Sequence, residues 1–319
     1  MIKYVLIFLS ILAILALVIY TVASFYCLGM VVNRKKKQKP PTKEVHVIRA
    51  EMRRQNNQKL YERNPEDITI KSFDNLDMKA WFLPVENSKR FVICVHGYGG
   101  NGPDEFSQMM PFYHDDLGYN YLLPDLTAHG RSRGKYIGFG TFDSKNVILW
   151  AKYLVERFCE DIEIILHGMS MGAATVMIVN ESDPPPQVKL IIEDCGFTCA
   201  HDQIYDTAVH TLGFDCRHLV ASASFLCNLF VGYKFKDSDP LGNMDKAKNP
   251  ILFIHGEGDT FVPFNFGQQL YEACTAVPKD YLWVPGAIHT FSYIDAKEQY
   301  EKKVKDFIAA HLDKDTVTA

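Results

Sequence analysis

Hydrophobic residues in this chain gather in short runs of β-strand length, separated by polar loops. From about residue 91 onward the runs are nearly continuous, which is typical of strands buried on both faces of a parallel sheet. The first two runs alternate apolar and polar residues, so we expect them to form an antiparallel edge. The predicted strands are 67–73, 78–84, 91–97, 119–125, 162–168, 188–194, 250–256 and 280–286.

Helical patterns lie between these runs. Apolar residues recur on one helical face from Val147 to Phe158 and again from Tyr300 to Leu312. Regular alternation of strands and helices implies right-handed crossovers. The pattern therefore predicts an α/β protein with a mostly parallel, doubly wound sheet.

The segment of about 197–247 departs from this alternation, because it contains no strand signal and has a long apolar run at 219–233. An insertion at this point lies over the carboxyl edge of the sheet, where ligands bind in open α/β folds. We expect a small helical cap over a site. The alternative is a pair of helices that only packs at the periphery.

The N-terminus has a different pattern, because Tyr4 to Val32 contains no charged residue. The run is longer than the roughly 20 residues that span a bilayer as a helix. It is also longer than the roughly 7–15 apolar residues of a cleavable signal peptide. Residues 1–33 are therefore predicted to be one transmembrane anchor, and a signal peptide cleaved near Ala23 is the alternative.

Charge predicts which side of the membrane the remaining chain occupies. Lys3 and the α-amine precede the span, whereas six basic residues follow it within the segment 34–43. The positive-inside bias therefore favours the cytoplasm for the body of the chain. Residues 34–64 are interpreted as a basic linker and lead-in. Residues 65–315 are interpreted as one large α/β domain. The net charge of −4 has no basic excess in the body, which disfavours nucleic acid as a partner.

Eight cysteines occur in the 319 residues, without the spacing of a compact disulfide framework. Cys195, Cys199 and His201 lie close in sequence, and Cys216 and His218 follow. Paired CxxC ligands are absent from the sequence, so the pattern favours reduced thiols and predicts no metal site.

The segment Gly168-Met169-Ser170-Met171-Gly172 follows an apolar strand and precedes a helical run of small residues. A serine hydroxyl needs a nearby base and donors for the oxyanion that it generates. A sharp strand-to-helix turn exposes the side chain and directs N–H groups of the next helix toward the reacting carbonyl. This pattern resembles the nucleophile elbow of α/β-hydrolases.

Two further residues follow in the order that such a site requires. Asp259 lies in a glycine-rich turn after one strand, and His289 lies after the next. Both come just beyond the carboxyl ends of strands, where loops meet over one edge of the sheet. Asp194, at the end of another strand, is the competing candidate for the acid. His201, His210 and His218 of the predicted cap are candidates only for lining a pocket.

Three further motifs, "FVICVHGYGGNG" (91–102), "PDLTAHGRSRG" (124–134) and "HGEGDTFVP" (255–263), resemble the α/β-hydrolase superfamily. The resemblance extends over residues 65–312. Within the superfamily, the chain resembles membrane-anchored bacterial serine hydrolases of the serine aminopeptidase (S33-like) and monoglyceride-lipase-like branches.

This resemblance implies a role for each matching position. Ser170 would be the nucleophile, His289 the general base and Asp259 the residue that orients the imidazole. The backbone N–H groups of Tyr98 and Met171 would form the oxyanion hole. The Tyr98 ring would also shape an acyl pocket. His96 would be structural. Apart from the resemblance, His129 and His255 lie in glycine turns and Asp125 lies in its own turn, so these three are also interpreted as structural.

These features predict a serine hydrolase that needs no metal or organic cofactor. A hydrophobic cap beside a bilayer favours a carboxylic ester of an apolar or acyl substrate over a thioester or amide. The alternatives are an aminopeptidase or amidase on the same triad, and a non-catalytic binding module with a hydrolase fold. A halide-cleaving enzyme would carry aspartate at position 170. The oligomeric state has no signal in the sequence.

Overall fold

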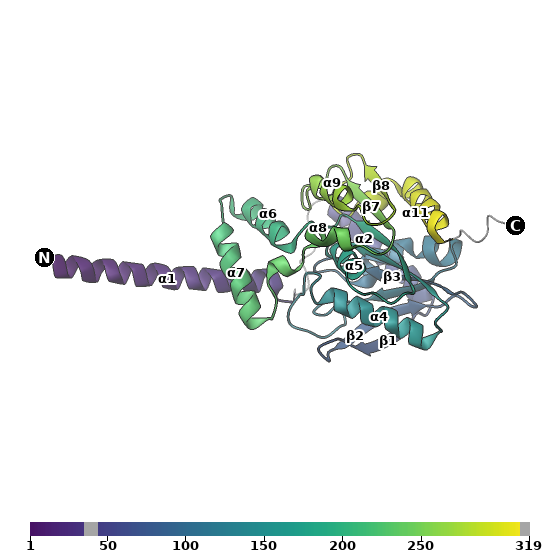
Figure 1. Ribbon diagram of the computed structural model, residues 1–319, viewed down its shortest axis with the longest axis horizontal. Coiled ribbons are helices and arrows are strands. Elements are labelled where there is room, and N and C mark those ends of the chain that lie inside the picture. Colours follow the sequence, from purple (N-terminus) through teal and green to yellow (C-terminus); the bar gives the residue numbers. More distant parts are fainter. Residues whose placement is uncertain (35–43, 313–319) are drawn as a thin grey trace.

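A central sheet organises the protein, whose computed structural model describes residues 1–34 and 44–312 (Figure 1). Its strands follow the order β1-β2-β4-β3-β5-β6-β7-β8. β1 and β2 form the antiparallel edge, and the strands from β4 to β8 are parallel to one another. The bounds are β1 (Glu66–Lys71), β2 (Asp77–Leu83), β3 (Arg90–Val95), β4 (Asn120–Pro124), β5 (Glu163–Met169), β6 (Val188–Asp194), β7 (Ile251–Gly256) and β8 (Lys279–Val284). The predicted fold class is confirmed.

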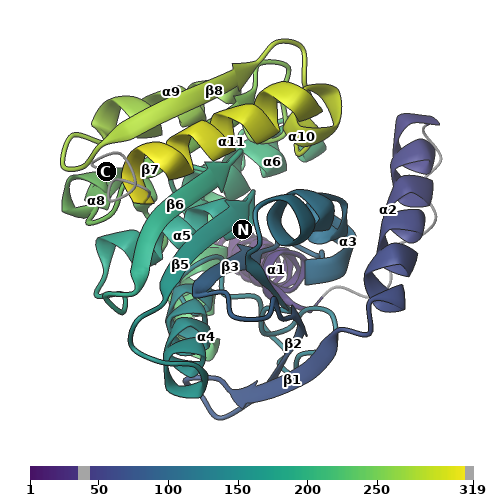
Figure 2. The same ribbon diagram turned by 90° about the vertical axis from the view of Figure 1, so that its right-hand side faces the viewer.

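Helices cover both faces of the sheet, so its central strands are buried on two sides (Figure 2). Phe91 and Ile93 of β3 face one apolar core, whereas Val92 and Cys94 face the other. The first core is closed by α4 (Asp143–Arg157), α5 (Met171–Glu181) and α9 (Phe264–Ala273). The second is closed by α3 (Gly102–Phe106) and α11 (Lys297–Leu312).

Short helical segments complete the domain. They are η1 (Ser107–Met109), η2 (Pro111–Asp116), η3 (Phe235–Asp237), α8 (Pro240–Asn243), η4 (Met244–Lys246) and α10 (Ser292–Asp295). They lie between α3 and β4, between α7 and β7, and between β8 and α11.

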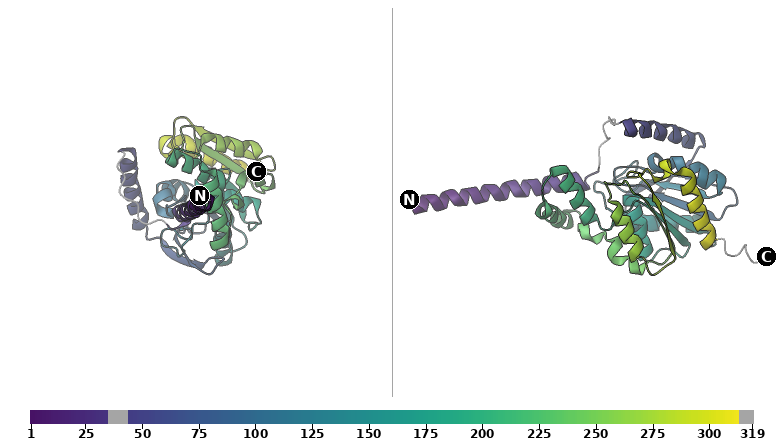
Figure 3. Two further views of the ribbon diagram at one scale, coloured as in Figure 1. Left: turned by 90° about the vertical axis from the view of Figure 1, so that its left-hand side faces the viewer. Right: turned by 90° about the horizontal axis from the view of Figure 1, so that it is seen from above.

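Helix α1 (Ile2–Val32) projects away from the domain (Figures 1 and 3). Among the described residues it is the one helix long and apolar enough to cross a membrane, a test that a signal sequence near the N-terminus would also pass. Residues 2–22 are exposed, whereas Ser24, Leu28 and Val32 are buried on one face. Leu28 and Val32 belong to the same core as α4 and α5. The last turns of α1 are therefore part of the domain.

Helix α2 (Glu44–Glu62) lies at the side of the domain next to α3 (Figure 2). These residues belong to the predicted lead-in to the domain, residues 34–64. Most of the predicted basic linker, residues 35–43, lies outside the described residues.

The segment 197–247 is helical in the structure and contains α6 (Ala200–Leu212) and α7 (Arg217–Phe230). We call α6 and α7 the cap helices. Helix α7 packs along the end of α1, where the rings of Phe25 and Phe230 lie 5.6 Å apart. The Tyr20 hydroxyl donates a hydrogen bond of 2.8 Å to the carbonyl oxygen of His218. The cap helices are therefore attached to the end of α1 through α7.

Candidate active site

Ser170 lies at the corner between β5 and α5, in a strained conformation with φ 56° and ψ −118°. Few residues other than glycine adopt a positive φ, and such strain is commonly found at functional sites. Glycine is required at both flanking positions because neighbouring backbone passes too close to leave room for a side chain. A Cβ on Gly172 would lie 1.8 Å from the carbonyl oxygen of Val95, and one on Gly168 would lie 2.2 Å from that of Gly172. The backbone bend thus presents the serine.

His289 and Asp259 complete a chain of contacts with this serine. The Nε2 atom of His289 lies 2.9 Å from Oγ of Ser170, and its Nδ1 lies 2.6 Å from Oδ2 of Asp259. Ser170 is 7% exposed, and the His289 side chain is 19% exposed. The structure therefore brings together three residues from the loops after β5, β7 and β8, as their spacing predicted.

The carboxylate of Asp259 is held on both oxygens. Its Oδ1 accepts hydrogen bonds of 2.9 and 3.0 Å from the N–H groups of Phe261 and Val262. His255 lies 3.5 Å from Oδ2. Burial alone would raise the pKa of Asp259, but the hydrogen bonds from His255 and His289 outweigh it and hold this pKa well below its usual range. The residue is therefore an anion that can orient and stabilise an imidazolium.

Asp194, the competing acid, has a different set of contacts. Its Oδ2 accepts a hydrogen bond of 3.1 Å from the Tyr300 hydroxyl, and its backbone oxygen accepts the N–H of Ser170 at 2.8 Å. Burial raises the pKa of the Asp194 carboxyl to about 6. This residue supports the turn that carries the serine, whereas Asp259 contacts the histidine.

The two predicted oxyanion donors lie on segments that adjoin the serine. Met171 is the first residue of α5, and N–H groups in a first helical turn lack an acceptor within the helix. Tyr98 follows Gly97, whose N–H donates to Oε2 of Glu105 at 2.7 Å. A Cβ on Gly97 would lie 3.1 Å from Cβ of Ser170, so the loop after β3 passes directly beside the serine.

The remaining predicted structural residues hold loops together. Nδ1 of His96 donates to the carbonyl oxygen of Gly97 at 2.8 Å, and its Nε2 accepts the N–H of Leu126 at 2.9 Å. The Asp125 carboxylate accepts the N–H groups of Gly102 and Arg131. The three histidines of the cap helices, His201, His210 and His218, do not line the pocket described below.

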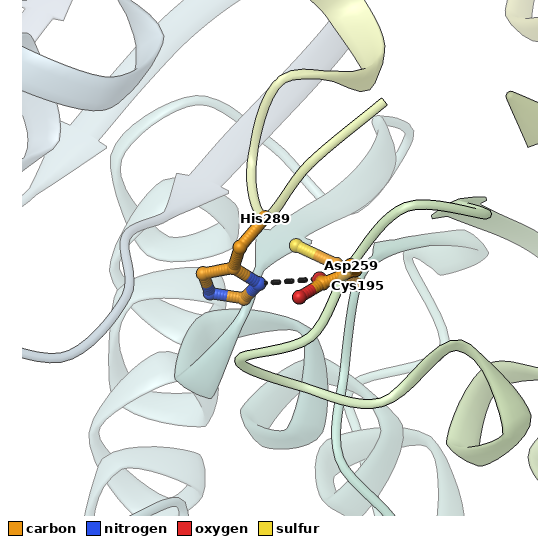
Figure 4. Close-up of side chains that lie close together, drawn as sticks. All are labelled: Cys195, Asp259 and His289. Atoms are coloured by element: carbon orange, nitrogen blue, oxygen red, sulfur yellow. Dashed lines mark hydrogen bonds and ion pairs between the residues drawn. The ribbon is translucent and has the colours of Figure 1, made fainter. Parts of the chain in front are cut away.

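One group of potential metal ligands forms among the described residues, from Cys195, Asp259 and His289, with ligand atoms within 4.8 Å of one another (Figure 4). Burial raises the pKa of the Cys195 thiol well above 9, so the thiolate that binds metals is disfavoured. Both ring nitrogens of His289 already have partners. This donor set suits a proton relay better than a metal. The group is also not the one considered from the sequence, because it contains Cys195 but neither Cys199 nor His201.

An apolar pocket of about 400 Å³ opens next to Ser170. Its volume falls within the range of roughly 300–1,000 Å³ that is typical of small-molecule sites. Tyr98 and Phe139 line it beside the serine, with ring centroids 5.1 Å apart, as expected for a tyrosine that shapes the pocket. The cap helices, the end of α1 and the loops after β6 and β7 form the remaining walls.

Sequence reasoning missed two contributors to this region. The end of α1 lines the pocket through residues that include Ala23 and Cys27. No sequence signal singles out this end of the helix, because small residues also occur earlier in the span, at Ala13 and Ala16. The second contributor is Arg49 of α2, which donates to Oγ1 of Thr290 at 2.5 Å and lies 4.7 Å from the centre of the Phe291 ring. No local pattern identified it.

Comparison with known proteins agrees with this architecture. The model of the prolyl oligopeptidase family matches residues 106–315. The uncharacterised protein YqkD of Bacillus subtilis is 27% identical over 241 residues, which cover 76% of this chain and 78% of that protein. The lysophosphatidylserine lipase ABHD12 of Xenopus tropicalis is 25% identical over 210 residues, which cover 64% of this chain and 52% of that protein.

The Pyrococcus furiosus esterase Pf2001 has a similar fold, with a TM-score of 0.67 and 19% identity over 88% of this chain and 98% of that one. These matches do not test the narrower resemblance to the serine aminopeptidase and monoglyceride-lipase-like branches, which stays a prediction. The protein is a hydrolase-fold enzyme by these comparisons. Since the family model matches more than half of its residues, the chain belongs to the prolyl oligopeptidase family within the α/β-hydrolase superfamily.

Proposed function

We propose that this protein is a serine hydrolase that cleaves a carboxylic ester with an apolar acyl group through an acyl-enzyme. The observation that carries the proposal is the unbroken contact chain from Ser170 through His289 to Asp259, at the side of an apolar pocket. Relatives described as a lipase and an esterase support the same class of substrate.

The geometry supports a separate step for each group in this proposal. His289 Nε2 takes the proton of Ser170 Oγ as this oxygen attacks the ester carbonyl, and Asp259 stabilises the imidazolium that forms. The N–H groups of Tyr98 and Met171 donate to the oxyanion of the tetrahedral intermediate. His289 then protonates the leaving alcohol. Water, deprotonated by His289, hydrolyses the acyl-enzyme, so the reaction requires no cofactor.

The pocket favours an acyl group over the free amine of a peptide. An aminopeptidase needs an acidic group to hold that amine, whereas no aspartate or glutamate of the described chain lines this pocket. The intact set of three contacts also argues against a purely binding role for the fold. Amide cleavage on the same triad is therefore the second candidate.

We further propose that α1 anchors the protein in a membrane and that the hydrolase domain faces the cytoplasm. Residues 2–22, the exposed part of α1, match the roughly 20 residues that a bilayer core requires. The basic residues after the span favour the cytoplasmic side. Protease treatment of intact cells, compared with permeabilised ones, tests the side: we expect cleavage of the domain only after permeabilisation.

Labelling by a fluorophosphonate probe tests the chemistry. We expect the full-length protein to be labelled, to hydrolyse p-nitrophenyl esters faster than aminoacyl amides, and to lose both labelling and turnover as Ser170→Ala. Removal of such a serine lowers kcat by roughly 10⁴- to 10⁶-fold. Labelling that survives Ser170→Ala would show that another residue is the nucleophile.

A further inference from the structure

The pocket beside Ser170 has a wall formed by the end of α1. Ala23 and Cys27 of α1 are partly buried and line the pocket. At the inner end, the Tyr98 hydroxyl donates a hydrogen bond of 2.6 Å to the carbonyl oxygen of Val31, and both residues also line the pocket. From Ala23 to Val31 the helix rises about 12 Å, at about 1.5 Å per residue. The pocket thus follows α1 outward from the reacting serine.

This wall is fixed to the domain and is not a loosely tethered segment. The N–H of Ile137 donates to the carbonyl oxygen of Val32 at 2.7 Å, and the N–H of Arg34 donates to that of Lys135 at 2.8 Å. The Arg34 guanidinium also donates to the carbonyl oxygen of Ser132 at 2.6 Å. The end of α1 therefore keeps one position relative to the serine.

The pocket opens where α1 leaves the domain. Five large apolar lining residues are strongly exposed. Tyr26, Met30, Leu212 and Phe214 lie at this mouth, where α1 and the end of α6 leave the domain, whereas Phe261 packs against His289. The exposed apolar surface continues on one side along α1 and on the other over Phe225, Leu229 and Phe230 of α7. Patches of this kind mark sites of protein or membrane interaction. Because the exposed span of α1 begins at the same level, the bilayer is the occupant that fits this surface.

We propose that the pocket is an acyl-chain channel with α1 as one wall, which takes the substrate, a long-chain fatty acyl ester, from the bilayer. The proposal rests on the hydrolase function proposed above and names its substrate class. The chain enters between the exposed rims of α1 and α6, lies along Ala23 and Cys27, and places its ester at Ser170. Helix α1 thereby determines acyl specificity in addition to anchoring the protein.

Two adjacent positions on α1 provide a matched test. Ala23 lines the channel, whereas Val22 is 63% exposed and does not. The full chain is placed in nanodiscs of a diether phosphatidylcholine, which an esterase does not cleave. Active protein is counted by fluorophosphonate labelling, and kcat/KM is measured for p-nitrophenyl butanoate and decanoate.

Ala23→Trp is expected to lower the ratio of decanoate to butanoate kcat/KM by about tenfold or more, since lost room for methylene groups carries effects of this size. Val22→Trp should change the ratio by less than about twofold, because substitutions at exposed positions usually have small effects. Ala23→Leu, a smaller change, should give an intermediate ratio and serves where Ala23→Trp does not fold.

The possible outcomes separate the two proposals. Labelled variants at position 23 that keep the wild-type ratio would overturn the channel and leave the hydrolase intact. A wild-type protein without labelling or ester turnover would overturn both. Monooleoylglycerol embedded in the same nanodiscs should be hydrolysed by the wild type, and more slowly by Ala23→Trp. Wild-type protein that cleaves the dissolved esters but leaves the embedded one intact would contradict loading from the bilayer.

Discussion

The candidate active site at the carboxyl edge of the sheet and the junction of α1 with the cap helices differ in how they are held together. At the edge, polar side chains and backbone groups fix each other at hydrogen-bond distance, from Ser170 to His289 and Asp259. At the junction, apolar side chains such as Leu28 and Val32 pack into a shared core. The edge tolerates little change in chemistry, whereas the junction tolerates little change in shape.

The largest expected effect is chemical and lies at the edge. Asp259→Asn should lower kcat about 10⁴-fold, because an asparagine cannot hold the Nδ1–H tautomer of His289 or stabilise its cation. Asp194→Asn is the matched control and should retain far more activity, since Asp194 contacts Tyr300 and the serine turn. Ester turnover per labelled site measures both. A greater loss of ester turnover in Asp194→Asn than in Asp259→Asn would show that Asp194 is the acid that acts with His289.

The next effect is one of packing and lies at the junction. Leu28→Ala should lower the free energy of unfolding by roughly 2–5 kcal/mol, as expected when a buried leucine leaves a cavity. Leu17→Ala, on the exposed part of α1, should have little effect on the domain. Thermal unfolding in detergent gives the comparison. Equal shifts for the two variants would show that α1 is only a tether.

This contrast explains how much of the molecule could be predicted from its sequence. The strands and the candidate site could be predicted because their signals are local: Ser170 lies between two required glycines, and Asp259 and His289 each follow an apolar strand. The wall at Ala23 could not, because an apolar helical residue has the same sequence signal whether it faces lipid or protein. Arg49 could not, because its partner Thr290 is 241 residues away.

A third prediction uses pH to separate the two regions. Burial raises the pKa of Glu193, at the end of β6, from 4.5 to about 8. The folded state therefore keeps a proton that the unfolded chain has lost. The resulting stabilisation is complete below about pH 4.5 and is lost as pH rises to about 8.

Glu193→Gln should remove this dependence. Between pH 6 and pH 8, the melting temperature of the wild type should fall by about 3 °C or more relative to this variant, since one pKa unit corresponds to about 1.4 kcal/mol. The Leu28→Ala variant should keep the wild-type pH profile, because its defect is one of packing. Parallel profiles for wild type and Glu193→Gln would contradict a buried, protonated Glu193.

The smallest expected effect concerns Arg49, which holds the loop of His289 from outside the sheet. Thr290 has a positive φ of 63°, and Arg49 donates to its hydroxyl and its carbonyl oxygen. Arg49→Ala should lower kcat about tenfold with a smaller change in KM, because hydrogen bonds to charged groups contribute about 1.5–3 kcal/mol. Arg49→Lys should restore part of the rate. An unchanged rate in Arg49→Ala would show that the loop holds His289 without α2.

Trapping of the acyl-enzyme tests the central claim most directly. The full-length protein is mixed with p-nitrophenyl decanoate, quenched in acid within the first turnovers, digested and mapped by mass spectrometry. We predict a decanoyl group on the peptide that contains Ser170, and none on this peptide in Ser170→Ala. A decanoyl group on another residue, or turnover of the ester without any acylated peptide, would contradict the account.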